Sequence, residues 1–111
     1  MVTLSSHLLN SVNGTHASNL DVIIFQIKPN GERNVFCETK TDIGGRLLKE
    51  FNLSKEDCNS EYEMVCRTGD YFSQKKMVSE IIIKFKMSDP NKKYHIPIII
   101  SPNGYSIWWS D

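Results

Sequence analysis

The stretch IIIKFKMSDPNKKYHIPIIISPNGYSIWW, residues 81–109, decides the fold class. It contains three runs that are rich in β-branched and aromatic residues, at 81–86, 94–101 and 105–109. Such runs predict β-strands, and the Pro, Asn and Gly residues that stand between them predict turns. This part of the chain is therefore predicted to form three consecutive strands.

The rest of the chain continues the pattern. Alternating or continuous apolar residues predict strands at about 3–10, 20–28, 33–41 and 61–67, with a further short strand after Arg46. The run at 20–28 is apolar almost throughout, which is typical of a strand covered on both faces. Residues 54–59 are polar and predict a loop, whereas 70–76 is the one predicted helix. Seven or eight short strands predict an all-β protein, a β-sandwich.

The composition limits the possible functions. The 111 residues suffice for a single domain, 1–111, and 13 Lys and Arg residues balance 13 Asp and Glu residues. This balance predicts no nucleic-acid partner, and no apolar run reaches the roughly 18 residues of a membrane-spanning helix. The first residues lack the pattern of a secretory signal, so we expect a cytoplasmic protein. Cys37, Cys58 and Cys66 have no Cys-x-x-Cys spacing and are predicted to be reduced.

The histidines are the natural candidates for proton transfer near neutral pH. His16 follows Asn13-Gly14-Thr15 in a predicted turn, and we interpret it as a solvated surface residue. His7 and His95 lie within predicted strands, on the face opposite to the apolar side chains of those strands. A single strand histidine is more commonly a structural hydrogen-bonding group than a catalyst, so neither residue identifies a site by itself.

Arg46 is the cation that could complete such a site. It follows a turn in which Gly44 and Gly45 permit positive φ, and the turn is predicted to deliver it onto a short strand. Two imidazoles and a guanidinium can make a hydrolytic site, because an imidazole can deprotonate water and the guanidinium can stabilise oxyanion charge. The spacing along the chain leaves open whether His7, Arg46 and His95 meet.

Four motifs resemble those of the transthyretin-related 5-hydroxyisourate hydrolases. Residues 94–106, from Tyr94-His95-Ile96-Pro97 to Gly104-Tyr105-Ser106, are similar to the C-terminal signature of that family. Ser6-His7-Leu8-Leu9-Asn10 is similar to its N-terminal histidine motif, Thr41-Asp42-Ile43-Gly44-Gly45-Arg46 to its turn motif, and Thr68-Gly69-Asp70-Tyr71-Phe72 to its mid-chain motif. The motifs occur in family order and together span nearly the whole chain.

The resemblance implies a transthyretin-like β-sandwich of two four-stranded sheets with one short helix. It implies a homotetramer with active sites at subunit interfaces, and hydrolysis of 5-hydroxyisourate without cofactor or metal. By motif position, His7, Arg46 and His95 would be catalytic and would bind the substrate, whereas His16 matches no motif residue. Water would attack a ring carbonyl and open the six-membered ring. His95 is provisionally the base, and His7 would hold the substrate or pass a proton to the departing nitrogen; the two roles could be exchanged.

The C-terminus departs from the family pattern. Members typically end in Thr-Tyr-Arg-Gly-Ser, whereas this chain ends in Ile107-Trp108-Trp109-Ser110-Asp111. Trp108 would replace the tyrosine and Ser110 could supply the terminal hydroxyl one position early, so both are candidate substrate-binding residues. Trp109 takes the place of the arginine, which removes a cation and adds a stacking surface. In the alternative interpretation, the two tryptophans pack at a subunit interface.

Two other functions remain open at this point. The first is a non-catalytic transthyretin-like carrier of a flat aromatic molecule, which the two tryptophans would favour and the retained His7, Arg46 and His95 would not. The second is a metal-binding module using His7, His95 and a cysteine, which lacks suitable ligand spacing and a fourth ligand. A hydrolase that uses these histidines should lose activity below about pH 6, as the imidazoles become protonated.

Overall fold

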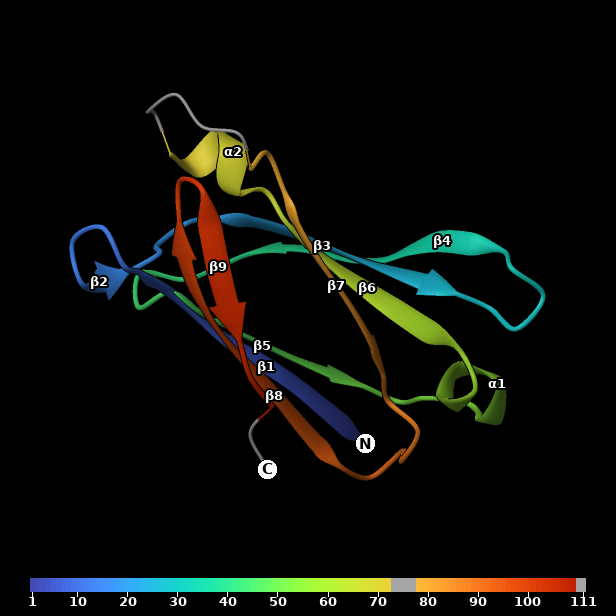
Figure 1. Cartoon of the computed structure of the whole chain (residues 1–111). Coiled ribbons are helices and arrows are strands. Elements are labelled where there is room, and N and C mark those ends of the chain that lie inside the picture. Colours follow the sequence, from blue (N-terminus) through green and yellow to red (C-terminus); the bar gives the residue numbers. More distant parts are fainter. Residues whose placement is uncertain (73–77, 110–111) are drawn as a thin grey trace.

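The computed structural model describes residues 1–72 and 78–109 and contains two β-sheets that lie one over the other (Figure 1). The strands of the first sheet are β1 (Val2–Asn10), β2 (Thr15–His16), β5 (Arg46–Phe51), β8 (Lys93–Ser101) and β9 (Gly104–Ile107). β1 pairs in parallel with β8 along one edge and antiparallel with β2 and β5 along the other. β9 pairs antiparallel with β8.

The second sheet is antiparallel throughout. Its strands lie in the order β4 (Arg33–Lys40), β3 (Asp21–Ile27), β6 (Glu61–Cys66) and β7 (Ile81–Lys86). The short helix α1 (Lys55–Cys58) precedes β6, and α2 (Thr68–Tyr71) follows it. The predicted all-β sandwich is confirmed.

The two sheets bury a common core between them. In β1 every second residue, from Val2 to Asn10, is buried, and the residues between them are only half-buried. The core includes side chains from both sheets, among them Leu4, Leu8, Ile98, Ile24, Met64 and Ile81. This alternation leaves the odd-numbered residues of β1 on the outer face of the first sheet, as the sequence pattern predicted for His7.

The loop predicted at 54–59 is wrong, because this segment contains α1. The hydroxyl of Ser54 accepts a hydrogen bond from the N–H of Asp57, and the Asp57 carboxylate accepts one from the N–H of Ser54. This reciprocal arrangement is a capping box, which satisfies two backbone donors at the start of a helix. The polar side chains that predicted a loop are therefore the cap of a single helical turn.

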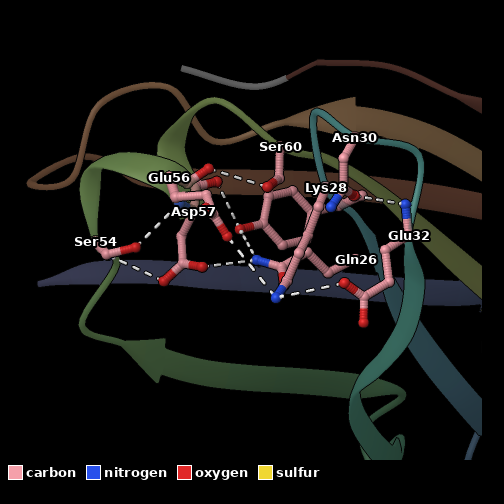
Figure 2. A network of polar contacts seen from close by, with 9 residues as sticks. Gln26, Lys28, Asn30, Glu32, Ser54, Glu56, Asp57 and Ser60 are labelled. Atoms are coloured by element: carbon pink, nitrogen blue, oxygen red, sulfur yellow. Dashed lines mark hydrogen bonds and ion pairs between the residues drawn. The ribbon is translucent and has the colours of Figure 1, made fainter.

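The capping carboxylate also connects α1 with the second sheet (Figure 2). Gln26 of β3 donates from Nε2 to Asp57 Oδ1 (2.8 Å) and to the Tyr62 hydroxyl (3.1 Å), and that hydroxyl donates to the Asp57 carbonyl (2.8 Å). The pKa of the Asp57 carboxyl is lowered, chiefly by the hydrogen bond from the Ser54 backbone. Lys28 adds ion pairs to Glu32 and Glu56, so the network joins α1 to the β3–β4 turn.

Three further predictions change in detail. The predicted helix at 70–76 corresponds to α2, which begins earlier, at Thr68, while residues 73–77 lie outside the described part of the chain. His16 lies in the two-residue strand β2 and not in a turn, so the first sheet has five strands instead of four. β3 alternates buried and half-buried residues, so the prediction that it is covered on both faces is wrong for the single chain.

None of the helices within residues 1–72 and 78–109 has the length and apolar composition needed to cross a bilayer.

Candidate functional site

A tight turn after β4 delivers Arg46 to the first position of β5. The carbonyl of Asp42 accepts from the N–H of Gly45 (3.0 Å), and its Oδ1 accepts from the N–H groups of Gly44 and Arg46 (2.9 Å each). Gly45 has a φ of +71°, and a Cβ at this position would lie 2.5 Å from the Leu8 carbonyl oxygen. The turn therefore requires glycine at position 45, and it fixes where Arg46 enters the sheet.

Strand pairing places Arg46 next to His7. In the antiparallel pair of β1 and β5, His7 is directly opposite Arg46, and in the parallel pair of β1 and β8 it is level with Pro97. Directly opposed residues share one face of a sheet. Because β1 buries its even-numbered residues, His7 and Arg46 lie on the outer face, where His7 is half-buried and Arg46 is exposed.

His95 reaches the same face from β8. It is level with Ser5, which precedes His7 by two residues on β1. The Ser5 hydroxyl lies 2.8 Å from His95 Nδ1, and this hydrogen bond orients the imidazole. The structure thus brings the three predicted catalytic residues, His7, Arg46 and His95, onto one face of one sheet.

His7 lies in surroundings that disfavour its protonated form. Burial lowers the pKa of His7 below its ordinary value, and the Arg46 guanidinium and His16 lower it further. A hydrogen bond to the Gly44 backbone acts in the opposite direction, and His95 makes a smaller lowering contribution. His7 is therefore neutral at neutral pH and can accept or donate a hydrogen bond there.

The two tryptophans follow β9 along the edge of the first sheet. The N–H of Trp108 donates to the carbonyl of Pro97 (3.4 Å), which places its backbone level with the row that contains His7 and Arg46. The Trp109 ring packs edge-on against Tyr94, with 5.6 Å between the ring centroids. Ser110, the other predicted substrate-binding residue, lies outside the described residues.

The outer face of the first sheet is open in the single chain. A hollow of about 420 Å³ lies over β3 and β4, where Asp21, Lys40 and Arg67 contribute to its lining, and none of the three predicted catalytic side chains lines it. No group of three or more His, Cys, Asp and Glu side chains within the described ranges, 1–72 and 78–109, is arranged to hold a metal ion.

The sequence comparisons identify the family. A profile of the HIUase/Transthyretin family matches residues 4–109. The chain belongs to this family. Among its relatives, the 5-hydroxyisourate hydrolase of Salmonella dublin is 33% identical over 108 residues, which cover 95% of this chain and 78% of the relative. The 5-hydroxyisourate hydrolase of Halalkalibacterium halodurans is 28% identical over 112 residues, which cover 95% of this chain and 94% of the relative. The predicted family is confirmed.

Solved structures share the fold of this HIUase/Transthyretin family member. The 5-hydroxyisourate hydrolase of Klebsiella pneumoniae matches with a TM-score of 0.79 and 22% identity over 100% of both chains. The (S)-allantoin synthase matches with a TM-score of 0.82 and 24% identity over 99% of this chain and 44% of that chain. This chain thus spans less than half the length of the synthase. The predicted transthyretin-like sandwich is confirmed.

Two polar residues of the site did not emerge from the sequence. Ser5 stands on the same strand face as His7, but only the parallel pairing of β1 with β8 shows that it contacts His95. His16 lies with its Nδ1 2.9 Å from His7 Nε2, although it matches no family motif. The signal that could have revealed His16 is the Asn13-Gly14 turn, because it folds the chain back along β1.

Proposed function

We propose that this member of the HIUase/Transthyretin family hydrolyses 5-hydroxyisourate, the substrate named for its relatives. The observation that carries the proposal is the placement of His7, Arg46 and His95 on the outer face of the first sheet, with His7 opposite Arg46 and His95 held by Ser5. All three residues stand in the motifs that resemble the hydrolases.

His95 is the proposed general base. When its Nδ1–H donates to the Ser5 hydroxyl, the lone pair of Nε2 is free to take a proton from water. The water oxygen then bonds to the carbonyl carbon, and the carbon–nitrogen bond of the six-membered ring breaks. The proton held by His95 passes to the departing nitrogen, so the ring opens to a carboxylic acid and His95 returns to its neutral form.

His7 and Arg46 are proposed to hold the substrate. The neutral His7 ring can hydrogen-bond to the polar heterocycle, and the guanidinium of Arg46 can stabilise the negative charge that develops on the attacked carbonyl oxygen. One such contact contributes about 3 kcal/mol of transition-state stabilisation where water is partly excluded.

We further propose that the protein is a homotetramer in which neighbouring subunits cover this face, with Trp108 and Ser110 lining the site. An open outer face that carries the exposed side chain of Leu48 opposite Ser5 supports a covered interface. A cytoplasmic location is also proposed, and the three free cysteines suit a reducing compartment.

The decisive experiment follows the ultraviolet decay of freshly generated 5-hydroxyisourate. The unmodified protein should accelerate the decay, and the His7→Ala and His95→Ala variants should lose most of this acceleration. Lys93→Ala is the matched control, because Lys93 lies on β8 two residues before His95 and is exposed. It should remain active.

Each outcome decides between two functions. Loss of acceleration in both histidine variants, with the Lys93 control active, supports the hydrolase. If the unmodified protein does not accelerate the decay but binds a flat aromatic molecule, the chain is a carrier and the proposed function is wrong.

A further inference from the structure

His7, one of the three residues described above, forms a pair of imidazoles with His16, which is not one of them. His7 Nε2 lies 2.9 Å from His16 Nδ1, and the two rings have centroids 5.0 Å apart with planes tilted by 30°. The distance is that of a good hydrogen bond. Two neutral imidazoles can bond in this way only if one supplies an N–H and the other a lone pair.

The backbone holds His16 in this position. β2 pairs His16 with Leu9, and the N–H of the next residue, Ala17, donates to the carbonyl of Leu8 (2.9 Å). Ala17 is fully buried, so the chain is anchored immediately after His16. Position 45 packs so closely that an added Cβ would lie 3.0 Å from His16 Cβ. The fold therefore fixes the backbone of His16 beside His7, and the exposed His16 side chain completes the contact.

We propose that His16 is a positioning residue of this site, which orients the His7 imidazole and shares a proton with it. The effect on the reaction rate rests on the proposed hydrolase function, whereas the shared proton is a property of the two rings. His16 would thus be a feature of this chain's own site, added to the residues that the family motifs supply.

The charges around the pair limit it to one extra proton. The groups that face His7 are Arg46 on β5, His95 on β8 and His16 on β2, while the nearby Asp42 carboxylate is engaged by backbone N–H groups of its own turn. The neutral pair already holds one hydrogen between its ring nitrogens, so an added proton binds an outer nitrogen and makes one ring a cation. A second would place two cations side by side next to Arg46, which Coulomb repulsion opposes. Arg46, His16 and His95, on three neighbouring strands, therefore all oppose protonation of His7.

The first test is the pH profile of 5-hydroxyisourate hydrolysis by three variants. His16→Ala should lower kcat by about 2- to 10-fold, the loss expected for one net hydrogen bond, with little change in KM. It should also shift the acid limb of the pH profile, the range in which activity falls as pH is lowered, to higher pH. The reason is that His7 loses a neighbour that lowers its pKa. His16→Asn places an amide where Nδ1 stands, so it should recover kcat but keep the shifted acid limb. Val12→Ala, an exposed change in the same hairpin, should leave both unchanged.

The second test needs no catalysis. Nuclear magnetic resonance of the imidazole nitrogens should show His7 titrating at higher pH in His16→Ala than in the unmodified protein, because His16 lowers the pKa of His7. An unchanged titration of His7, or an unchanged acid limb in an active His16→Ala variant, would overturn the inference. A shifted His7 titration in a protein without hydrolase activity would instead refute the proposed function and retain the pair.

Discussion

His7 shows how neighbouring groups set the chemistry of one residue. Its ring is half-buried on a sheet face, opposite a guanidinium and hydrogen-bonded to a second imidazole. Burial is the main cause of its lowered pKa, and the Arg46 charge is the next. Both disfavour the imidazolium form, so the neutral ring persists at pH values where a solvated histidine would already carry a proton.

The lowered pKa of His7 predicts how its own protonation affects activity at acidic pH. A lowered pKa means that His7 stays neutral below pH 6.5, so kcat/KM should hold through neutral pH and fall only at about pH 6 or below. Arg46→Gln should lower kcat/KM and also move the acid limb upward, since removing the cation raises the pKa of His7. Steady-state rates between about pH 5 and 8 provide the measurement, and a flat profile would contradict histidine base catalysis.

The sequence identified candidate site residues at positions that lie within a family motif. His7, Arg46 and His95 could be selected because residue type, strand periodicity and family motif agreed. Ser5 and His16 could not, since each depends on a cross-strand contact that neither residue's own segment encodes. His16 is exposed, as predicted, but its contact with His7 becomes visible only when the pairing of β1 with β2 is known.

Among the elements, the turn between β4 and β5 matters most for the site. It sets the position of Arg46 through the bonds of Asp42 and the left-handed conformation of Gly45. The Leu8 N–H also donates to the Gly45 carbonyl (2.8 Å), so this turn is bonded directly to the strand that carries His7.

Gly45→Ala should therefore destabilise the protein and displace Arg46. The added methyl group would meet the Leu8 carbonyl at 2.5 Å in a backbone that L-residues rarely adopt, so we expect a loss of more than about 2 kcal/mol in the free energy of unfolding. Gly14→Ala is the matched control: its φ is +73°, but nothing lies within 4 Å of the new Cβ. It should cost only about 1 kcal/mol. Urea denaturation measures both, and equal losses would show that close packing at Gly45 is unimportant.

The elements that the sequence predicted incorrectly are all short. α1 and β2 comprise 4 and 2 residues, too few for a periodic pattern to develop. Their formation depends on tertiary contacts, which are the bonds from Gln26 and Tyr62 for α1 and the pairing with Leu9 for β2. Longer strands such as β7, predicted at 81–86 and found at Ile81–Lys86, contain enough β-branched and aromatic residues to be recognised from the sequence.

For the whole molecule, stability depends on the core between the sheets. Ile81 and Ile82 are neighbours on β7 with the same side chain, but Ile81 is fully buried and Ile82 is 51% exposed. Ile81→Ala should lower the free energy of unfolding by about 2–5 kcal/mol, because it removes buried methyl groups and leaves a cavity. Ile82→Ala should cost less than about 1 kcal/mol. Denaturant midpoints compare the two, and a similar loss at both positions would mean that the outer face of β7 is also covered.

The arrangement of the sheets was the part of the fold that periodicity could not supply. Alternation along β1 and β8 predicted which side chains share a face, but nothing local indicates that these strands pair in parallel. That pairing was not predicted from the sequence, and only the structure shows it. It is also what brings His95 and Ser5 together across 90 positions of the chain.

This separation has a consequence for synthesis on the ribosome. At roughly 5–20 residues per second, the amino-terminal strand emerges about 5–20 s before the strand that completes its second edge. During that interval the edge of β1 that later pairs with β8 presents a row of unpaired backbone N–H and C=O groups. Such an open edge favours association with other unfinished chains. Slower translation would lengthen this exposure, so production in cells should depend on elongation speed and on chaperones that shield the open edge.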